Sequence, residues 1–271
     1  MLFRVFILAG LIGLACSTGC GDDGGFDAGV PDTVAQGSIT VTWSITDPAG
    51  VELGGTRSQQ CDKAGAIKVI LTATKLGGAS IDLDPFSCDS GQATQALDFG
   101  VYNFTFALHG FENGQNLKIT STNRSQINVT AGAPVPLAPI TFPINATGGL
   151  QLTLLAGTSG NCMGGAGITG LSISLAHDGG PGDTACEPVV FGLSSGGTFD
   201  ASSCSSPSVQ GCVDAGVTLT APSLPSGPYL IQVIGKKLST VCWTNNDSFS
   251  VPSQGRTLSR VLNLARAPGC P

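Results

Sequence analysis

One stretch of the chain has the residue pattern of a serine nucleophile. Residues 192–196 read G-L-S-S-G, which matches G-x-S-x-G around Ser194. A nucleophile elbow needs a strand before this pattern, a helix after it, and a histidine later in the chain. Here the pattern lies in a Ser/Gly-rich segment, and both histidines, His109 and His177, precede it. We therefore predict no catalytic residues, and we keep a secreted hydrolase using Ser194 or a histidine as an alternative.

Metal-ligating patterns are also weak. Asp178 and Asp183 bracket a Gly/Pro loop, and two carboxylates are fewer than a calcium loop supplies. The cysteines show no C-x-x-C pair or Cys/His spacing of the zinc type. We expect a turn at this loop, and no metal and no cofactor in the protein.

The two tryptophans differ in their surroundings. Trp43 lies on the apolar side of an alternating stretch, which predicts a core position. Trp243 follows Cys242 directly and precedes the polar run 244–247. Trp243 is therefore the possible contact residue for a ligand, either a protein or a carbohydrate.

Alternating side chains predict the strands that must carry these residues. Both tyrosines, Tyr102 and Tyr229, stand two residues after a glycine, Gly100 and Gly227, at the start of an alternating apolar stretch. A period of two sends successive side chains to opposite faces of a sheet. The glycine suits a tight turn, and the tyrosine can bury its ring and direct its hydroxyl at backbone, as in a tyrosine corner.

The same order of elements occurs twice along the chain. Charged residues make up only 11% and no stretch has sustained helical periodicity, which predicts an all-β protein. We expect two tandem antiparallel β-sandwich modules, residues 37–145 and 149–271. The second module contains an additional Ser/Gly/Cys-rich segment, about 189–221, interpreted as an insertion.

Eight cysteines follow residue 36, and an even number in an exported chain predicts disulfides. The repeat places Cys61 with Cys162 and Cys88 with Cys186, which predicts equivalent bonds in the two modules. The expected pairs are Cys61–Cys88, Cys162–Cys186, Cys204–Cys212 within the insertion, and Cys242–Cys270 at the C-terminal tail.

The N-terminal residues predict export. Residues 1–15 combine Arg4 with an apolar run from Val5 to Ala15, as in a signal peptide, and this run is too short to span a bilayer. Residues 12–15 read I-G-L-A and precede Cys16, which resembles the lipobox of bacterial lipoproteins. The resemblance implies that Cys16 carries palmitate-type acyl chains, with Cys20 as the alternative. Ser17 after it implies the outer membrane.

Residues 16–36 form the predicted lipidated tether. This segment is rich in Asp and Gly and poor in bulky apolar residues, which is typical of a disordered linker. The formal net charge of the chain is −6, which argues against a nucleic-acid partner. The expected partners are the membrane, through the lipid, and an unidentified protein or carbohydrate.

The order of strands and turns resembles that of transthyretin-like modules, including carboxypeptidase regulatory-like and Cna-B-type domains. The residues that carry the resemblance are Leu224, Gly227 and Tyr229, matched by Leu97, Gly100 and Tyr102. An immunoglobulin-like topology remains an alternative. Together with the lipobox, the resemblance implies a non-enzymatic envelope lipoprotein for adhesion or ligand binding, or an accessory subunit of an envelope complex.

Overall fold

The computed structural model of the chain describes residues 36–112, 115–178 and 184–270. The predicted signal peptide, Cys16, Cys20 and all but residue 36 of the predicted tether lie outside these ranges. No helix within the described ranges has the length and apolar content needed to cross a membrane.

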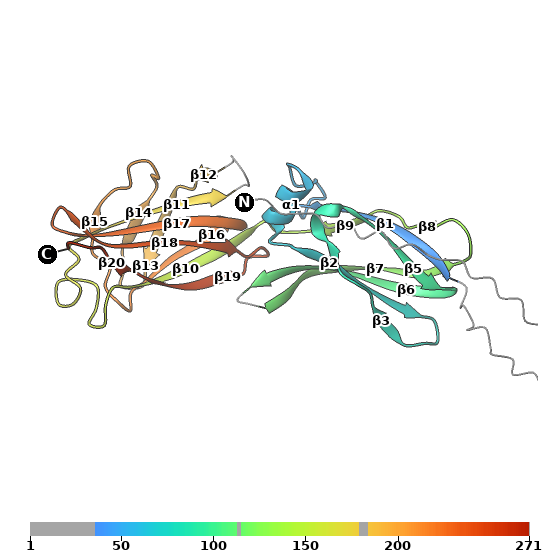
Figure 1. The fold of residues 1–271 in the computed structure, drawn as a ribbon. Helices are drawn as coiled ribbons and strands as arrows, with labels where there is room; N and C mark the ends of the chain where they lie inside the picture. Colours follow the sequence, from blue (N-terminus) through green and yellow to red (C-terminus); the bar gives the residue numbers. More distant parts are fainter. Residues whose placement is uncertain (1–35, 113–114, 179–183, 271) are drawn as a thin grey trace, which may run out of the picture. The chain divides into compact units, whose positions relative to one another are not determined.

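Residues 36–143 form two β-sheets, called here the first sheet pair and drawn from blue to green in Figure 1. Its elements are β1 (Gln36–Thr46), α1 (Arg57–Ala64), β2 (Lys68–Lys75), β3 (Ser80–Asp82), β4 (Phe86–Ser87), the 3₁₀ turn η1 (Cys88–Ser90), β5 (Gln92–Asp98), β6 (Gly100–Glu112), β7 (Gln115–Val129), β8 (Val135–Pro136) and β9 (Ile140–Pro143).

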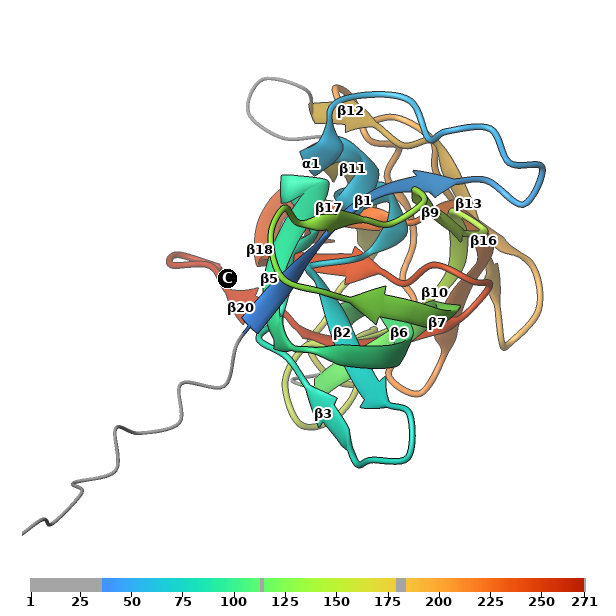
Figure 2. The same ribbon diagram turned by 90° about the vertical axis from the view of Figure 1, so that its right-hand side faces the viewer.

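The opening strand β1 lies at the centre of one of these sheets. It pairs antiparallel with β5, which lies beside it in Figure 2. On its other side it pairs parallel with β8 and β9. The second sheet has the order β3-β2-β6-β7, and β4 also pairs with β2. Ile39, Val41, Trp43 and Ile45 alternate along β1 and are each at most 2% exposed. Their side chains share one hydrophobic cluster with residues of β2 and β6, so the two sheets pack face to face.

Residues 147–266 form two further sheets, the second sheet pair. Its strands are β10 (Thr147–Leu155), β11 (Gly170–Asp178), β12 (Thr184–Cys186), β13 (Val189–Leu193), β14 (Thr198–Ala201), β15 (Gln210–Gly211), β16 (Thr218–Pro225), β17 (Gly227–Lys237), β18 (Thr240–Val251), β19 (Thr257–Asn263) and β20 (Ala265–Arg266).

The pairing in the second sheet pair follows that of the first. The strand β10 pairs antiparallel with β16 and parallel with β19, as β1 does with β5 and β9. The other sheet has the order β12-β11-β17-β18-β20, in which β11, β17 and β18 correspond to β2, β6 and β7. A separate hydrophobic cluster fills the space between these sheets. The predicted all-β, sandwich-like fold is therefore confirmed.

The two tyrosines occupy matching places in the two sheet pairs. The Tyr102 hydroxyl donates to the carbonyl of Asp98 at 3.0 Å, and the Tyr229 hydroxyl donates to that of Pro225 at 2.8 Å. Both acceptors lie four residues upstream. Gly100 and Gly227, which begin these strands, have φ angles of 153° and 131°, a region that favours glycine. Each tyrosine thus ties its strand to the end of the strand before it.

One helix was not predicted. Helix α1 begins after Thr56, whose side chain accepts from the backbone N–H of Gln59 while the Gln59 side chain accepts from that of Thr56. This reciprocal arrangement is a capping box, and Gly65 ends the helix in the left-handed conformation. A helix of eight residues is too short to show helical periodicity, so periodicity alone could not predict α1. The sequence signal was instead the T-x-x-Q capping pattern at Thr56, with Gly65 at the other end.

Two predicted disulfides are wrong. The predicted bonds were Cys162–Cys186 and Cys204–Cys212. The observed bonds are Cys162–Cys212 and Cys186–Cys204. The other two bonds join the expected cysteines, Cys61–Cys88 and Cys242–Cys270.

The error came from the position of the insertion. Cys61 and Cys162 do lie in corresponding connections, between the first two long strands of each sheet pair. Cys88 precedes β5, and its counterpart is Cys212, which precedes β16. Cys186 instead ends β12, the counterpart of β3, and its bond to Cys204 has no equivalent in the first sheet pair. The repeat is therefore kept by Cys61–Cys88 and Cys162–Cys212.

The predicted C-terminal end of the insertion, residue 221, is also wrong, because the insertion ends before β16. Residues 218–225 form β16, in which Leu219 and Ala221 are buried opposite β10. The additional part is a hairpin of β13 and β14 that extends the same sheet beyond β16.

The disulfide assignment predicts a difference in stability between two double variants. Cys162→Ser/Cys212→Ser opens a loop with a sequence separation of 50, and Cys186→Ser/Cys204→Ser opens one of 18. Because the Cys186–Cys204 bond lies inside the larger loop and shortens it, loop-closure entropy predicts that the first variant loses about 0.5 kcal/mol more free energy of unfolding. Urea denaturation under non-reducing conditions measures this, and peptide mapping that found Cys162 linked to Cys186 would contradict the assignment.

The buried tyrosine predicts a loss of stability at alkaline pH. Burial, with a smaller effect of Glu187, raises the pKa of Tyr229 well above its usual 10. The unfolded tyrosine loses its proton near pH 10 whereas the folded one keeps it, so the stabilisation is complete below about pH 10 and declines as the pH rises further. Tyr229→Phe should be about 1 kcal/mol less stable at pH 7, but should decline less above pH 10. Urea denaturation across this range measures both, and parallel declines would refute the expectation.

Candidate functional site

The G-x-S-x-G stretch lies in a β-hairpin. Ser194 follows β13, and the chain continues into the strand β14 rather than into a helix. The Ser194 hydroxyl oxygen accepts from the backbone N–H of Thr218 at 2.9 Å, and the Ser194 N–H donates to the Thr218 carbonyl at 2.9 Å. Ser194 thus fastens the hairpin to β16, and its surroundings differ from the strand–turn–helix context of a nucleophile.

The two histidines are placed in different sheet pairs. His109 lies in β6, where burial, followed by Lys68 and Lys118, lowers its pKa. His177 lies in β11, with its ring edge-on to Tyr229 at a centroid distance of 4.8 Å. Neither histidine is among the polar contacts of Ser194 described above, so these groups do not form a nucleophile–base pair.

The loop expected between Asp178 and Asp183 is only partly described. Asp178 ends β11, and residues 179–183 lie outside the described ranges. Among the residues that are described, no three His, Cys, Asp or Glu side chains gather as a metal site would require.

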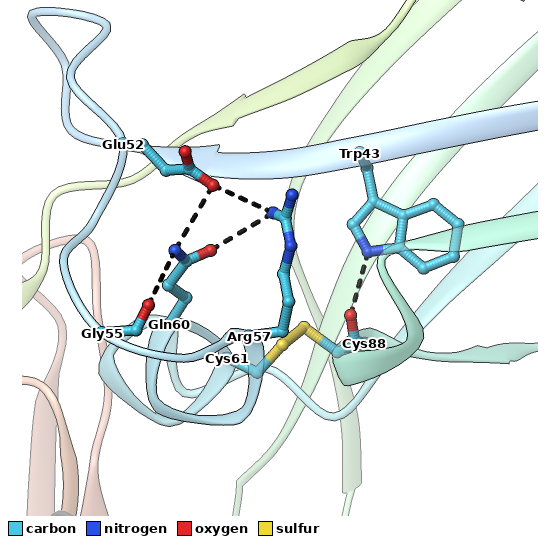
Figure 3. Close-up of polar contacts among 7 residues, drawn as sticks. All are labelled: Trp43, Glu52, Gly55, Arg57, Gln60, Cys61 and Cys88. Atoms are coloured by element: carbon cyan, nitrogen blue, oxygen red, sulfur yellow. Dashed lines mark hydrogen bonds and ion pairs between the residues drawn. A yellow bond between two sulfur atoms is a disulfide. The ribbon is translucent and has the colours of Figure 1, made fainter.

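Trp43 is a core residue that supports the helix α1. It is 2% exposed, and its indole N–H donates to the Cys88 carbonyl at 2.9 Å (Figure 3). Beside the Cys61–Cys88 bond, an Arg57 guanidinium nitrogen lies 3.2 Å from the Glu52 carboxylate and 3.3 Å from the Gln60 side-chain oxygen (Figure 3). Because these polar groups bind one another, the network fixes the connection from β1 to β2.

Trp243 is half-buried and lines a hollow of about 390 Å³ at one end of the second sheet pair. The other walls are residues 157–159 and 165–167 of the connection from β10 to β11, together with Lys237, Arg266 and Cys270. The indole N–H donates to the Ala166 carbonyl at 3.3 Å, which fixes the ring against this connection. The volume falls within the range of small-molecule sites, about 300–1,000 Å³.

A buried asparagine shapes the connection that lines this hollow. Asn161 is 2% exposed, and its side-chain oxygen accepts from the N–H of Ala156 at 2.6 Å. Its side-chain nitrogen donates to the carbonyls of Leu154 at 2.8 Å and Val213 at 3.0 Å. These bonds join the end of β10 to the segment before β16.

Asp214 and a disulfide hold the same connection from the other side. One Asp214 carboxylate oxygen accepts from the N–H groups of Asn161 at 2.8 Å, Ala215 at 2.8 Å and Cys162 at 3.4 Å. These backbone hydrogen bonds lower the Asp214 pKa. Cys162 is also bonded to Cys212. The wall of the hollow is therefore ordered before any ligand arrives.

The opposite wall depends on the last disulfide. Arg266 lies in β20, directly opposite Trp243 in the pairing of β18 with β20. The bond Cys242–Cys270 and the hydrogen bond from the Ala267 N–H to the Cys242 carbonyl, at 2.8 Å, hold this short strand in place. Trp243, which was predicted as a contact residue, thus lies in the wall of a hollow. Arg266 and Lys237 were not predicted, because a single cation carries no sequence signal.

A larger hollow of about 590 Å³ lies on the outer face of β11, β17 and β18. Its walls include Leu230, Gln232 and Asn246, and they contain no aromatic residue. Its carboxylate, Asp247, is paired with Arg260 at 2.8 Å. The hollow at Trp243 offers the more specific combination of an aromatic face and cations, and we take it as the candidate site.

The comparisons with known proteins name no family. No family model matches the chain, and no curated protein matches it. A leucine-rich repeat protein from Bacteroides thetaiotaomicron is similar with a TM-score of 0.26 and 12% identity, over 84% of this chain and 26% of that chain. The major pilin from Streptococcus pyogenes is similar with a TM-score of 0.26 and 10% identity, over 85% and 98% of the two chains. Similarities of this strength carry no information on function.

The order of the hollow predicts a large effect of one substitution. Asn161→Ala leaves one buried N–H and two buried carbonyls without the partner they have now, and should cost about 2–4 kcal/mol of unfolding free energy. Asn123→Ala, at an exposed position in β7, is the matched control and should change stability by less than about 0.5 kcal/mol. Equal losses in chemical denaturation would show that Asn161 does not order this wall.

Proposed function

We propose that this chain is a non-enzymatic lipoprotein of the cell envelope, which displays two β-sandwich modules and binds a ligand in the hollow at Trp243. The observation that carries the proposal is the hollow itself. Its walls are fixed by the bonds Cys162–Cys212 and Cys242–Cys270 and by the buried Asn161. A site that is ordered in advance loses little conformational entropy on binding.

Two separate hydrophobic clusters support the division into modules. One cluster contains residues between 39 and 144 and the other contains residues between 150 and 264. Each cluster is enclosed by corresponding strands, which are β1, β2, β5, β6, β7 and β9 in the first sheet pair and β10, β11, β16, β17, β18 and β19 in the second. A module with its own core is a unit that can be displayed on a surface.

The strand order supports the transthyretin-like reading of each module over the immunoglobulin-like one. In the constant-type immunoglobulin order, the first two strands are neighbours in one sheet. Here β1 and β2 lie in different sheets, and so do β10 and β11. The opening strand pairs instead with a strand near the end of its own module, β1 with β9 and β10 with β19.

The export of the chain is supported by its four disulfides, because such bonds form in oxidising compartments. The lipobox-like residues before Cys16 support attachment to a membrane. Each buried methylene of an acyl chain contributes about 0.8 kcal/mol, so several chains would hold the protein there. Ser17 supports the outer membrane as the location.

A second candidate is an accessory subunit of an envelope complex. The strand β7 spans fifteen residues, and in the described part of the chain its only strand partner is β6. The other edge of such a strand can accept an extended segment of a partner protein. A pull-down of intact complexes from solubilised membranes would separate this function from ligand binding.

The lipid anchor can be tested in cells of a Gram-negative host. With labelled palmitate, the wild-type protein should incorporate label and sediment with the outer membrane, and Cys16→Ala should lose both properties. Cys20→Ala is the matched control and should keep them. Label that persists in Cys16→Ala and disappears in Cys20→Ala would move the anchor to Cys20, and label in neither wild type nor variants would overturn the lipoprotein proposal.

A further inference from the structure

We propose that the hollow at Trp243 binds a sugar ring that carries an anionic group, as in an acidic polysaccharide. This inference rests on the proposed ligand-binding function and names the class of ligand. It is carried by the pairing of an indole with an arginine on one rigid wall.

Trp243 and Arg266 are direct partners in an antiparallel strand pair. Residues opposite each other in such a pair project from the same face, with Cβ atoms about 4.5–5.5 Å apart. An apolar ring face and a guanidinium therefore stand side by side. A sugar acid has the matching arrangement, with C–H groups on the ring and a charged group at its edge.

Packing and one hydrogen bond fix the position of the Trp243 side chain. A Cβ on Gly235, which faces Trp243 across β17 and β18, would lie 2.9 Å from the Ile168 side chain and 3.1 Å from the Trp243 Cβ. On the other side, the outer edge of the indole lies 3.9 Å from the Cβ position of Gly157. The glycine at 235 lets the Trp243 Cβ lie close to backbone, whereas the contact at Gly157 is an ordinary van der Waals one. The hydrogen bond to Ala166 fixes the orientation of the ring.

Arg266 has donors available for an anion. One guanidinium nitrogen donates to the Cys270 carbonyl at 3.2 Å, which positions the group at the edge of the hollow. The guanidinium carries five N–H donors, and its planar shape suits two parallel hydrogen bonds to a carboxylate or a sulfate.

The charge of the walls selects the sign of the ligand. Lys237 and Arg266 contribute two positive charges, and none of the residues that line the hollow is acidic. The chain as a whole has a net charge of −6, so this cationic spot contrasts with the rest of the molecule. The negative charge of the rest of the molecule repels an anionic ligand, and the positive field of the hollow attracts it.

The experiment is calorimetric titration of the full-length, oxidised protein in detergent with three oligosaccharides of equal length. One is an oligogalacturonate, one is a sulfated oligosaccharide, and one is a neutral oligoglucoside. At least one anionic probe should bind roughly 10-fold or more tightly than the neutral one, as expected for a charge-assisted contact. The two anionic arms distinguish a carboxylate from a sulfate.

The variants test the two halves of the site. Arg266→Gln, at an exposed position, should weaken the anionic probe by roughly 10-fold and leave the neutral probe unchanged. Trp243→Ala should weaken all probes, while Trp243→Phe restores part of the affinity. Arg124→Gln, a partly exposed arginine in β7 that does not line the hollow, is the control and should bind as the wild type does. Thermal unfolding verifies that each variant is folded.

The outcomes separate this inference from the function on which it rests. Neutral and anionic probes of equal affinity, or an Arg266→Gln variant that binds the anionic probe as wild type does, would overturn the anionic ligand and leave a neutral-sugar site. No binding of any probe at millimolar concentration would overturn the sugar ligand. The palmitate experiment decides the lipoprotein proposal independently of both results.

Discussion

One disulfide constrains each sheet pair. It joins the connection between the first two long strands to the segment just before β5 in the first pair, or just before β16 in the second. Cys61–Cys88 and Cys162–Cys212 are this bond in its two copies. In the first sheet pair it secures α1 and places the carbonyl to which Trp43 donates. In the second it secures a glycine-rich connection and forms one wall of a hollow. The same bond therefore supports a closed polar network in one copy and the wall of an open hollow in the other.

Much of the fold could be predicted from the spacing of apolar residues. Ile39, Val41, Trp43 and Ile45 alternate strictly, and alternation is the direct result of a sheet with one buried face. The two tyrosines were equally informative, because a glycine with positive φ followed by a tyrosine fits only a few places in a sandwich. Trp243 was predicted as a contact residue from its place beside a cysteine and a polar run. The structure places it half-buried in the wall of a hollow, and its contact with a ligand stays a prediction.

The missed features are those that depend on distant parts of the chain. The partner of Cys162 could not be chosen before the additional strands were located, and the Ser/Gly-rich composition of residues 189–217 conceals β13 and β14. Arg266 lies in a strand of two residues that exists because a disulfide and one N–H hold it against β18. The cationic side of the candidate site is therefore a product of tertiary structure, and Asn161 shows its role only through its buried contacts.

The parallel pairing of β1 with β9, and of β10 with β19, has a kinetic consequence. In each copy the opening strand cannot complete its sheet until about a hundred further residues have been made and folded. Contacts between residues so far apart in sequence slow the search for the native state, as in other sandwich proteins that fold in milliseconds to seconds. While that search lasts, an apolar strand edge stays open to wrong partners. A chain of this topology thus depends on protection from aggregation until the opening sheet of each copy is complete.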